Sequence, residues 1–442
     1  MQAEAAEVRI PQPPAARASE RKAGFYRQSW FWILTGLSLG VGAGLLLNVG
    51  ILPAAGAVLA GKTVSLGAAW GDLFLSILRY AAGPLVFTAI VSAVAGHEDP
   101  GELKSLSWKV LAYFVFTSTV ATLLGLGVAS ILRPGLMFAG SAAAGAAVST
   151  AALPTLKGFL LGLIPTDPLT PFLKANTLQV VLMGVVVAAA IALLKSSKNV
   201  RAKAIAAAAA RWASVGQGWV MKGMQLLMLG APVAAFGLLG RLFAQSGLGS
   251  LLGLGAYVGT VVLGLALLMV FYLLMIRLAT GHGPLWFLTR SREALLTGFS
   301  TASSAASMPV SLRTAIHELG VRPSLANLLI TLGAAVNQEG TALYQAVATL
   351  FLAQAFGVPL PLTALLYVLG VLVASSLGTP GAPGAGMAVL ATVLAGVGVP
   401  LQGIALILGV DRILDMCRTT LNVAGDLTSA VVMDAVGQRS KK

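Results

Sequence analysis

Long apolar segments separated by short polar ones fill most of the chain after residue 28. The clearest segments approach or exceed the roughly 20 residues that an α-helix needs to cross a bilayer. They are too long and continuous for the strands of a membrane β-barrel, where apolar and polar residues alternate over about 10 residues. The pattern predicts an all-α polytopic membrane protein, with spans at about 29–52, 70–95, 108–132, 176–194, 215–243 and 251–279.

Small and polar residues interrupt the apolar pattern beyond residue 279. Positions 298–309 are rich in hydroxyls, and positions 375–386 are rich in glycine and proline. Irregular backbone is tolerated at membrane depth only where it is buried in protein or lines a cavity. The two stretches therefore predict the tips of re-entrant hairpins at about 283–320 and 361–400.

A polar run, Asn-Gln-Glu-Gly-Thr at 337–341, interrupts the apolar segment 325–356 and predicts local unwinding of a helix. Unwound carbonyls can coordinate cations while the helix ends face a substrate. Two interrupted regions in comparable order, each a hairpin followed by a helix with polar insertions, indicate inverted repeats.

A last apolar segment at 403–434 carries charges on one face of the predicted helix. Asp411, Asp415, Arg418, Asn422 and Asp426 recur three or four residues apart, which keeps them on one side at about 100° per residue. A charge near the bilayer centre costs roughly 2.5–3.5 kcal/mol on insertion scales. This polar stripe could be an internal ion-pair seam, but its mixed charges favour a binding face for a small charged solute and its ions.

Composition and charge agree with a membrane protein. Of the 442 residues, 57% are hydrophobic and 10% are charged, whereas soluble proteins carry about 25% charged residues. The net charge of +14 comes from basic residues at the ends of apolar segments, which indicates topology by the positive-inside rule rather than nucleic-acid binding. The polar tail 1–28, the loop at 195–203 and the C-terminus are all basic, so both termini are predicted to be cytoplasmic, and eight spans fit.

Other classes of function find less support in the residues. The single cysteine, Cys417, excludes an intramolecular disulfide framework and a cysteine-based zinc site. Ser303 and Ser304 could suggest an intramembrane hydrolase, but a serine nucleophile needs a base, and no His or Lys lies in the apolar motifs nearby. An anion channel is a further alternative, in which Arg79 or Arg412 would line the path.

Four ordered motifs carry a family resemblance: Ser-Ser-Ala-Ala-Ser-Met-Pro-Val from 303, Asn-Gln-Glu-Gly-Thr-Ala-Leu-Tyr-Gln from 337, Gly-Thr-Pro-Gly-Ala-Pro-Gly-Ala-Gly from 378, and Asp-Arg-Ile-Leu-Asp-Met-Cys-Arg-Thr-Thr-Leu-Asn-Val-Ala-Gly-Asp from 411. Over about residues 25–437 the chain resembles the dicarboxylate/amino acid:cation symporters, the glutamate transporter family, in its prokaryotic type. The resemblance implies a homotrimer in the cell (inner or plasma) membrane, with eight spans, two re-entrant hairpins and elevator transport.

The resemblance also implies a division into a scaffold and a transport domain. The scaffold would hold helices 1–2 at 29–106 and helices 4–5 at 134–250. The transport domain would hold helix 3 at 107–133 and residues 251–437, which comprise helix 6, hairpin 1, helix 7, hairpin 2 and helix 8. The second hairpin would act as the gate.

By the same resemblance, Arg418 pairs with a side-chain carboxylate of the substrate and Asp415 binds its α-ammonium. A guanidinium suits the first role because it is always charged and binds a carboxylate through two parallel hydrogen bonds. Further substrate contacts are implied for Asn422, Thr419, Thr341, Ser304 and backbone groups around Gly381.

Substrate class follows from two of these positions. Family members for simple dicarboxylates tend to lack the equivalent of Asp415, and members for neutral amino acids replace the equivalent of Arg418. Both are present, so L-aspartate and L-glutamate are predicted, taken up with sodium. The alternatives are proton-coupled symport, a C4-dicarboxylate substrate, and substrate-gated anion channel activity.

The resemblance implies three cation sites built from oxygen ligands, which suit a hard cation. The first site would use Asp426, Asn337, Asn422 and Gly333. The second would use Thr117, Ser118, Asn337, Glu339 and the Phe114 carbonyl. The third would use carbonyls near Ala335, Ser376, Leu377 and Thr379.

The chain departs from the family pattern in the middle motif. The family's usual Asn-Met-Asp-Gly-Thr is Asn-Gln-Glu-Gly-Thr here, so Gln338 and Glu339 put the coupling ion in question. A buried Glu339 could also bind a proton, because burial disfavours the charged form. Gln345 stands where animal members have a glutamate linked to potassium coupling, which argues against potassium counter-transport.

Overall fold

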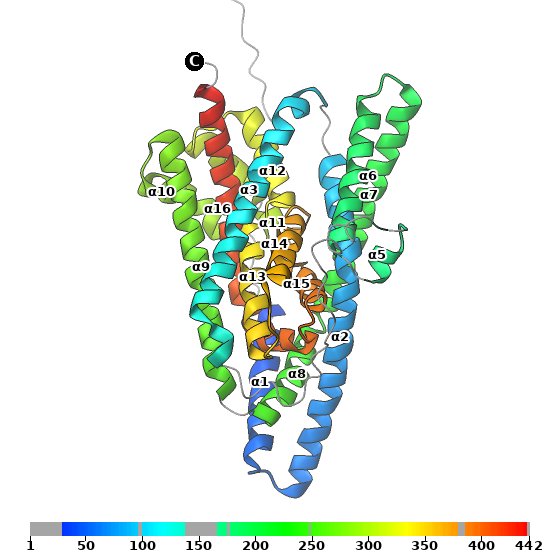
Figure 1. Cartoon of the computed structure of the whole chain (residues 1–442), viewed down its shortest axis with the longest axis vertical. Coiled ribbons are helices and arrows are strands. Elements are labelled where there is room, and N and C mark those ends of the chain that lie inside the picture. Colours follow the sequence, from blue (N-terminus) through cyan, green and yellow to red (C-terminus); the bar gives the residue numbers. More distant parts are fainter. Residues whose placement is uncertain are drawn as a thin grey trace, which may run out of the picture.

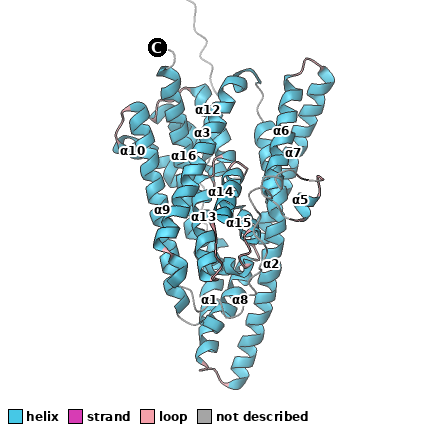
Figure 2. Ribbon diagram, viewed as in Figure 1, coloured by secondary structure: helices cyan, strands magenta, loops and turns pink. Residues whose placement is uncertain are grey.

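The computed structural model describes residues 29–95, 100–137, 165, 167–174, 177–246, 249–378 and 385–439. The predicted cytoplasmic tail, most of residues 138–176 and residues 379–384 of the second predicted hairpin tip lie outside these residues. All the regular structure in the described ranges is helical (Figure 2). The prediction of an all-α protein is therefore confirmed for this part of the chain.

Three helices pack together at one end of the molecule: α1 (Ser29–Val49), the first half of α2 (Ala54–Ala95) and α8 (Ala231–Ser246) (Figure 1). Glycines let these helices approach closely. A Cβ added to Gly237 would lie only 1.8 Å from the carbonyl carbon of Gly67, so a side chain at this crossing would force α2 and α8 apart. The helix α2 therefore begins at Ala54 and includes the small residues of 54–69, whereas the sequence predicted a span that begins at about position 70.

A second group lies along the other half of α2, as Figure 1 shows. Its members are the short α5 (Thr170–Leu173), α6 (Thr177–Ser196) and α7 (Val200–Met228). The sequence predicted one span at 215–243, but the chain bends by 49° between α7 and α8. Pro232 in the first turn of α8 has no N–H to bond the preceding turn. The Gly230 carbonyl at the bend accepts from the Ala234 N–H at 3.1 Å and also from the Trp70 indole N–H at 3.0 Å.

The last helix, α16 (Ile404–Arg439), lies on the opposite side of the molecule from α6 and α7 (Figure 1). It packs against α9 (Gly249–Thr280) along its length. The same helix α9 also contacts α3 (Pro100–Leu132), which is followed by the short turn η2 (Pro134–Met137).

Two pairs of short helices occupy the segments predicted as hairpins. The first pair is α10 (Pro284–Thr301) and α11 (Ser304–Arg313), followed by η3 (Thr314–Glu318). The chain turns at Ala302, whose φ of 49° is left-handed, and the Ser303 side chain caps α11 by accepting from the Ala306 N–H. The second pair is α14 (Leu362–Ser376) and α15 (Ala385–Gly396), with η4 (Leu401–Gly403) before α16.

Between these pairs the chain forms α12 (Pro323–Val336) and α13 (Glu339–Ala355), and the helix breaks at Asn337 and Gln338. The break falls within the run where the sequence predicted unwinding. Almost every residue of α13 is buried, because α3, α9, α14 and α16 all pack against it. The polar residues at the break therefore face protein from every side.

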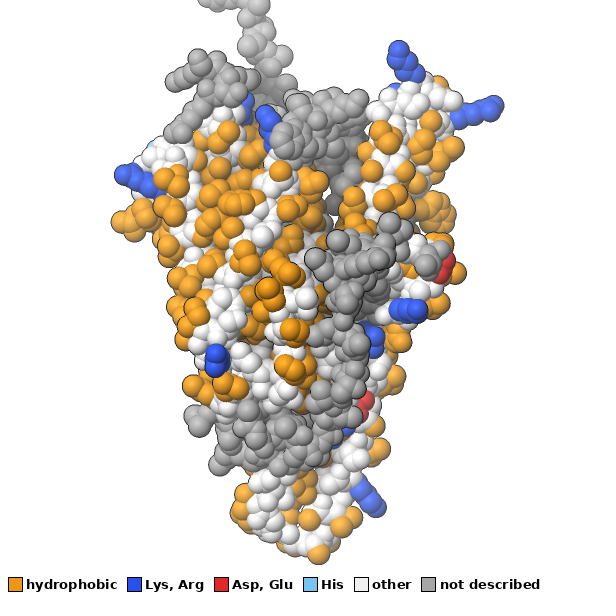
Figure 3. Space-filling view, viewed as in Figure 1, with side chains coloured by type: hydrophobic (Ala, Val, Ile, Leu, Met, Phe, Trp, Pro, Cys, Tyr) orange, Lys and Arg blue, Asp and Glu red, His pale blue; other side chains and the backbone are white. Residues whose placement is uncertain are grey.

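In the described residues, four helices are long and apolar enough to cross a membrane, and the bent pair α7 and α8 would add a fifth. Large apolar side chains cover the flanks of the molecule, and lysine and arginine side chains project from the tip of the α6–α7 pair (Figure 3). This distribution fits apolar flanks in lipid and basic ends in water. The full set of eight spans and two hairpins stays a prediction.

Candidate functional site

The polar stripe of α16 faces the interior of the protein. Arg418 is 2% exposed and is held between two aspartates of its own helix. Its Nε donates to Asp415 Oδ1 at 3.0 Å, and its Nη1 donates to Asp411 Oδ1 at 3.0 Å. Its guanidinium also lies over the ring of Tyr344 on α13, 4.3 Å from the ring centroid, which adds a cation–π contact.

The two arginines and two aspartates of this cluster balance in formal charge. Arg418 is paired with Asp411 and Asp415, and Arg412 Nη1 lies 3.8 Å from the second oxygen of Asp415. Buried charges are stable only when paired and hydrogen-bonded. A charged ligand can therefore enter only by exchanging one ion pair for another.

Asn422, one turn beyond Arg418, connects α16 to the break between α12 and α13. Its side-chain oxygen accepts from the Gly340 N–H at 2.8 Å. Its side-chain nitrogen donates to Gln338 Oε1 at 2.6 Å and to Thr341 Oγ1 at 3.2 Å. Three residues predicted to contact substrate, Arg418, Asn422 and Thr341, thus belong to one buried polar cluster.

Both pairs of short helices reach this cluster. Gly386 in the first turn of α15 is close enough that an added Cβ would lie 3.3 Å from Arg418 Nη2 and 3.0 Å from Thr341 Cγ2. Ser304 begins α11, which packs on α16, and its buried hydroxyl has no hydrogen-bond partner among the described residues. Thr419 of α16 is buried. Gly381 lies outside the described residues.

A second polar group lies one to two turns further along α16. Asn337 Nδ2 donates to Asp426 Oδ1 at 3.1 Å, and Gly333 adjoins the same carboxylate, since an added Cβ would lie 2.2 Å from Oδ1. The Asn337 side-chain oxygen is buried without a partner among the described residues. Asp426, Asn337 and Gly333, predicted to share one cation site, therefore lie together.

Glu339 adjoins this second polar group, and two hydroxyls face its carboxylate. Its carboxylate accepts hydrogen bonds from the Thr117 hydroxyl of α3 and the Tyr272 hydroxyl of α9. Gly425 of α16 lies against the same carboxylate, where an added Cβ would be 3.0 Å from Glu339 Oε2. The absence of a side chain at Gly425 leaves room for the extra methylene that distinguishes this glutamate from aspartate.

The third predicted cation site is only partly within the described residues. Ser376, at the end of α14, donates its hydroxyl to Ser118 of α3 at 2.8 Å, which joins residues assigned to two different sites. Leu377 directly follows α14 as its C-cap, and the Phe114 carbonyl oxygen lies 3.3 Å from the Thr117 hydroxyl oxygen within α3. Ala335 lies in the last turn of α12. Thr379 lies outside the described range.

Sequence reasoning did not find the two tyrosines of the site. Tyr344 faces Arg418 and Tyr272 faces Glu339, and both are almost completely buried. A signal was available for Tyr344, which follows Thr341 by one helical turn on a polar face. Tyr272 stands in an apolar segment, and nothing near it in the sequence indicated a carboxylate partner.

The donor set defines the chemistry that this region can perform. Carboxylates, hydroxyls and carbonyls are ligands for hard cations, and the described residues include no cluster of three or more His, Cys, Asp or Glu side chains. With paired charges inside an apolar helical bundle, the arrangement can bind a charged solute together with cations.

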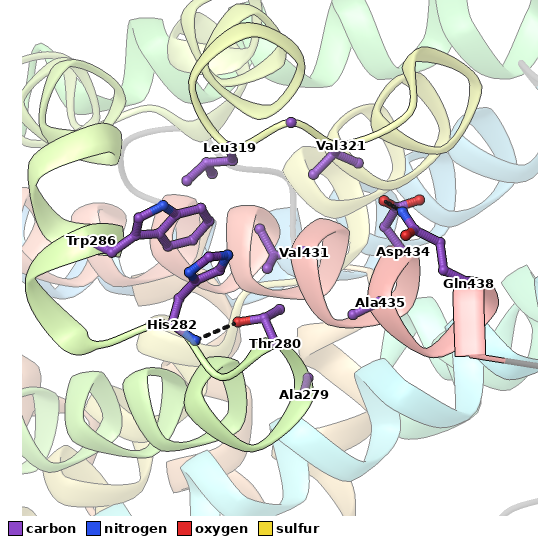
Figure 4. A pocket seen from close by; sticks show the side chains of 11 residues that line it. Ala279, Thr280, His282, Trp286, Leu319, Val321, Val431, Asp434, Ala435 and Gln438 are labelled. Carbon is purple, nitrogen blue, oxygen red and sulfur yellow. Dashed lines mark hydrogen bonds between the residues drawn. The ribbon is translucent and has the colours of Figure 1, made fainter.

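A separate pocket of about 320 Å³ lies near the C-terminal end of α16 (Figure 4). His282 stacks on Trp286 on one side, with ring centroids 4.1 Å apart, and Asp434 and Gln438 lie on the other. Asp434 is paired with Arg322 and accepts from Gln438. None of the predicted binding residues lines this pocket, so it is distinct from the candidate site.

The fold and the buried ionic site define a multi-pass membrane transport protein. The chain belongs to the sodium:dicarboxylate symporter family, whose model matches residues 30–436. It is therefore a transporter and not an enzyme, and the family couples transport to a cation.

Several relatives are named C4-dicarboxylate transport protein. One from Cupriavidus pinatubonensis is 32% identical over 372 residues, which cover 83% of this chain and 84% of the relative. One from Citrifermentans bemidjiense is 30% identical over 420 residues, covering 92% and 90%. One from Bordetella avium is 31% identical over 378 residues, covering 82% and 81%.

Proposed function

We propose that this symporter takes up acidic amino acids, L-aspartate and L-glutamate, with sodium as the coupling ion. The observation that carries the proposal is the buried pair of Arg418 and Asp415 beside the Asn422 amide. An acidic amino acid brings one ammonium and two carboxylates. Arg418 would exchange Asp415 for the side-chain carboxylate, and Asp415 would take the ammonium, so these four charges stay paired. The α-carboxylate would bind neutral donors such as the Asn422 amide.

A C4-dicarboxylate is the second candidate, favoured by the names of the relatives. Such a substrate has two negative charges and no cation. When it displaced Asp415 from Arg418, the Asp415 carboxylate would keep only Arg412, at 3.8 Å. Because an uncompensated buried charge is costly, the pairing in this chain favours the amino acid.

Sodium is proposed over protons because the predicted ligands are mostly neutral oxygens around Asp426 and Glu339. The proposed assembly is a homotrimer in the cell membrane with cytoplasmic termini, eight spans and two re-entrant hairpins. Scaffold (29–106 and 134–250) and transport domain (107–133 and 251–437) would move relative to each other as an elevator. Substrate-gated anion conductance is a further proposal that flux measurements can test.

Uptake of labelled L-aspartate into proteoliposomes tests the function directly. With an inward sodium gradient we expect uptake that saturates with substrate and is inhibited by L-glutamate. Excess succinate should not inhibit this uptake. A proton gradient without sodium should give only background uptake. Uptake driven by protons alone would contradict sodium coupling, and succinate uptake exceeding aspartate uptake would contradict the proposed substrate.

Gly378 provides a test of the elevator movement. This glycine follows α14, and an added Cβ would lie 2.5 Å from both Cδ1 and Cγ1 of Ile90 on α2. Gly378→Ala should therefore disfavour the observed packing of the second helix pair on α2. Overpacking typically costs about 1–3 kcal/mol, which changes a population ratio by about five- to 150-fold.

Spin labels at Tyr80 on α2 and Leu366 on α14, both exposed, can report this change in a Cys417→Ser background. We expect Gly378→Ala to decrease the population with the observed distance and to increase a second one. Gly255→Ala on α9, where an added Cβ meets nothing within 4 Å, is the matched control. An unchanged distance distribution in Gly378→Ala would argue against two positions of the pair.

A further inference from the structure

Gln338 lies at the break between α12 and α13, where the family usually has methionine. Its side chain is 3% exposed. Its Oε1 accepts a hydrogen bond of 2.6 Å from Asn422 Nδ2, whereas its Nε2 reaches only the Ala334 carbonyl at 3.5 Å. The strong contact of this side chain is therefore the one to Asn422.

The Asn422 side chain has its acceptor and its donor group occupied in this conformation. Its oxygen is fixed by the Gly340 N–H, and its nitrogen donates to Gln338 and Thr341. A substrate carboxylate can bind this amide only through the nitrogen. Because a carboxylate oxygen and an amide oxygen are both acceptors, Gln338 Oε1 presents to Asn422 the same kind of atom that a substrate would.

We infer that Gln338 is a positioning residue that competes with substrate for the Asn422 amide. In the observed conformation its Oε1 accepts from Asn422 Nδ2, and a substrate carboxylate that binds the same N–H must replace this hydrogen bond. This inference rests on the proposed function, because it takes Asn422 as a substrate contact. The competition lowers substrate affinity in the same way as any equilibrium that partly occupies a non-binding state.

A methionine at this position would not compete. Its thioether is only a weak acceptor, so the Asn422 nitrogen would keep Thr341 as its single good partner. One N–H of Asn422 would then lack a good acceptor, and a substrate carboxylate could accept from it without replacing an existing hydrogen bond. The choice between glutamine and methionine at position 338 therefore changes substrate affinity without changing the charges that define the substrate class.

Gln338→Met is expected to lower the Kd for L-aspartate about fivefold, which corresponds to one net hydrogen bond of ~1 kcal/mol. Kd is measured by titration calorimetry of the purified protein at saturating sodium. Gln338→Leu, which also removes the acceptor, should give the same direction. The preference for aspartate over succinate should not change, since Arg418 and Asp415 are untouched.

Gln354→Met is the matched control. It makes the same chemical change on α13, but the Gln354 side chain is hydrogen-bonded to the Ala129 carbonyl and the Gly135 N–H, away from the site. We expect it to lower thermal stability and leave Kd unchanged. A Kd that stays constant or rises in both Gln338 variants would overturn the inference.

Asn422→Ala distinguishes failure of the inference from failure of the proposed function. If Asn422 contacts substrate, the variant weakens binding, and adding Gln338→Met to it should bring no further gain. A fivefold gain in that background would show that Gln338 acts elsewhere and would overturn the inference. Unchanged aspartate binding in Asn422→Ala alone would instead remove Asn422 from the proposed site.

Discussion

Arg418→Cys is expected to abolish uptake of L-aspartate and L-glutamate. The substitution removes the buried cation proposed to bind the substrate's side-chain carboxylate. It also leaves Asp411 and Asp415 without their shared partner. Breaking a buried ion pair costs about 3–5 kcal/mol, so the affinity for acidic substrates should fall on the order of 10²–10³-fold. Neutral amino acids should become substrates, because Asp415 still provides an anion for the ammonium.

Arg322→Cys is the control, because it removes an arginine whose partner, Asp434, lies at the far end of α16. It should leave the substrate profile unchanged. Arg418→Lys keeps the charge without the two parallel hydrogen bonds of a guanidinium and should raise the KM for aspartate while retaining its transport. Normal aspartate uptake by folded Arg418→Cys protein in proteoliposomes would disprove the assigned role of Arg418.

Asp415→Ser should change the substrate class rather than abolish transport. Without the carboxylate the site loses the proposed partner of the ammonium, and aspartate uptake should fall on the order of 10²–10³-fold by the same estimate for a buried pair. The site also loses one negative charge, so a doubly charged dicarboxylate would meet less repulsion. Labelled succinate uptake should therefore rise above that of the unchanged protein.

Asp434→Ser on the same helix is the matched control for this change. Asp434 lies in the separate pocket of Figure 4, outside the candidate site, and its removal should affect stability without altering the ratio of aspartate to succinate uptake. If Asp415→Ser protein still prefers aspartate, the ammonium must be bound elsewhere. If the unchanged protein already prefers succinate, the substrate carboxylate that Arg418 binds belongs to a dicarboxylate.

Much of the site could be predicted because its residues repeat with the period of one helix. Asp411, Asp415, Arg418 and Asn422 share a face of any regular helix through that segment, whatever surrounds it. The break at Asn337 and Gln338 was also predictable, since polar residues and a glycine in an apolar helix weaken its regular backbone. These features depend on local sequence alone.

The bend between α7 and α8 was not predicted, although Gly230 and Pro232 lie within the apolar segment. Proline near a helix end is common, and hydropathy does not distinguish a bend from a continuous span. The Trp70 indole, 160 residues away in sequence, donates a further hydrogen bond to the Gly230 carbonyl at the bend. Local sequence contains no information about that partner.

The sequence by itself determined an apolar helical chain, a polar stripe on its last helix and a break in the helix at 325–356. Only the tertiary structure decided which groups meet there. It places Tyr344 over Arg418, Tyr272 against Glu339 and Gln338 on Asn422. Periodicity specifies the face on which a side chain lies, but a buried polar group must take the donors and acceptors that neighbouring helices bring to it.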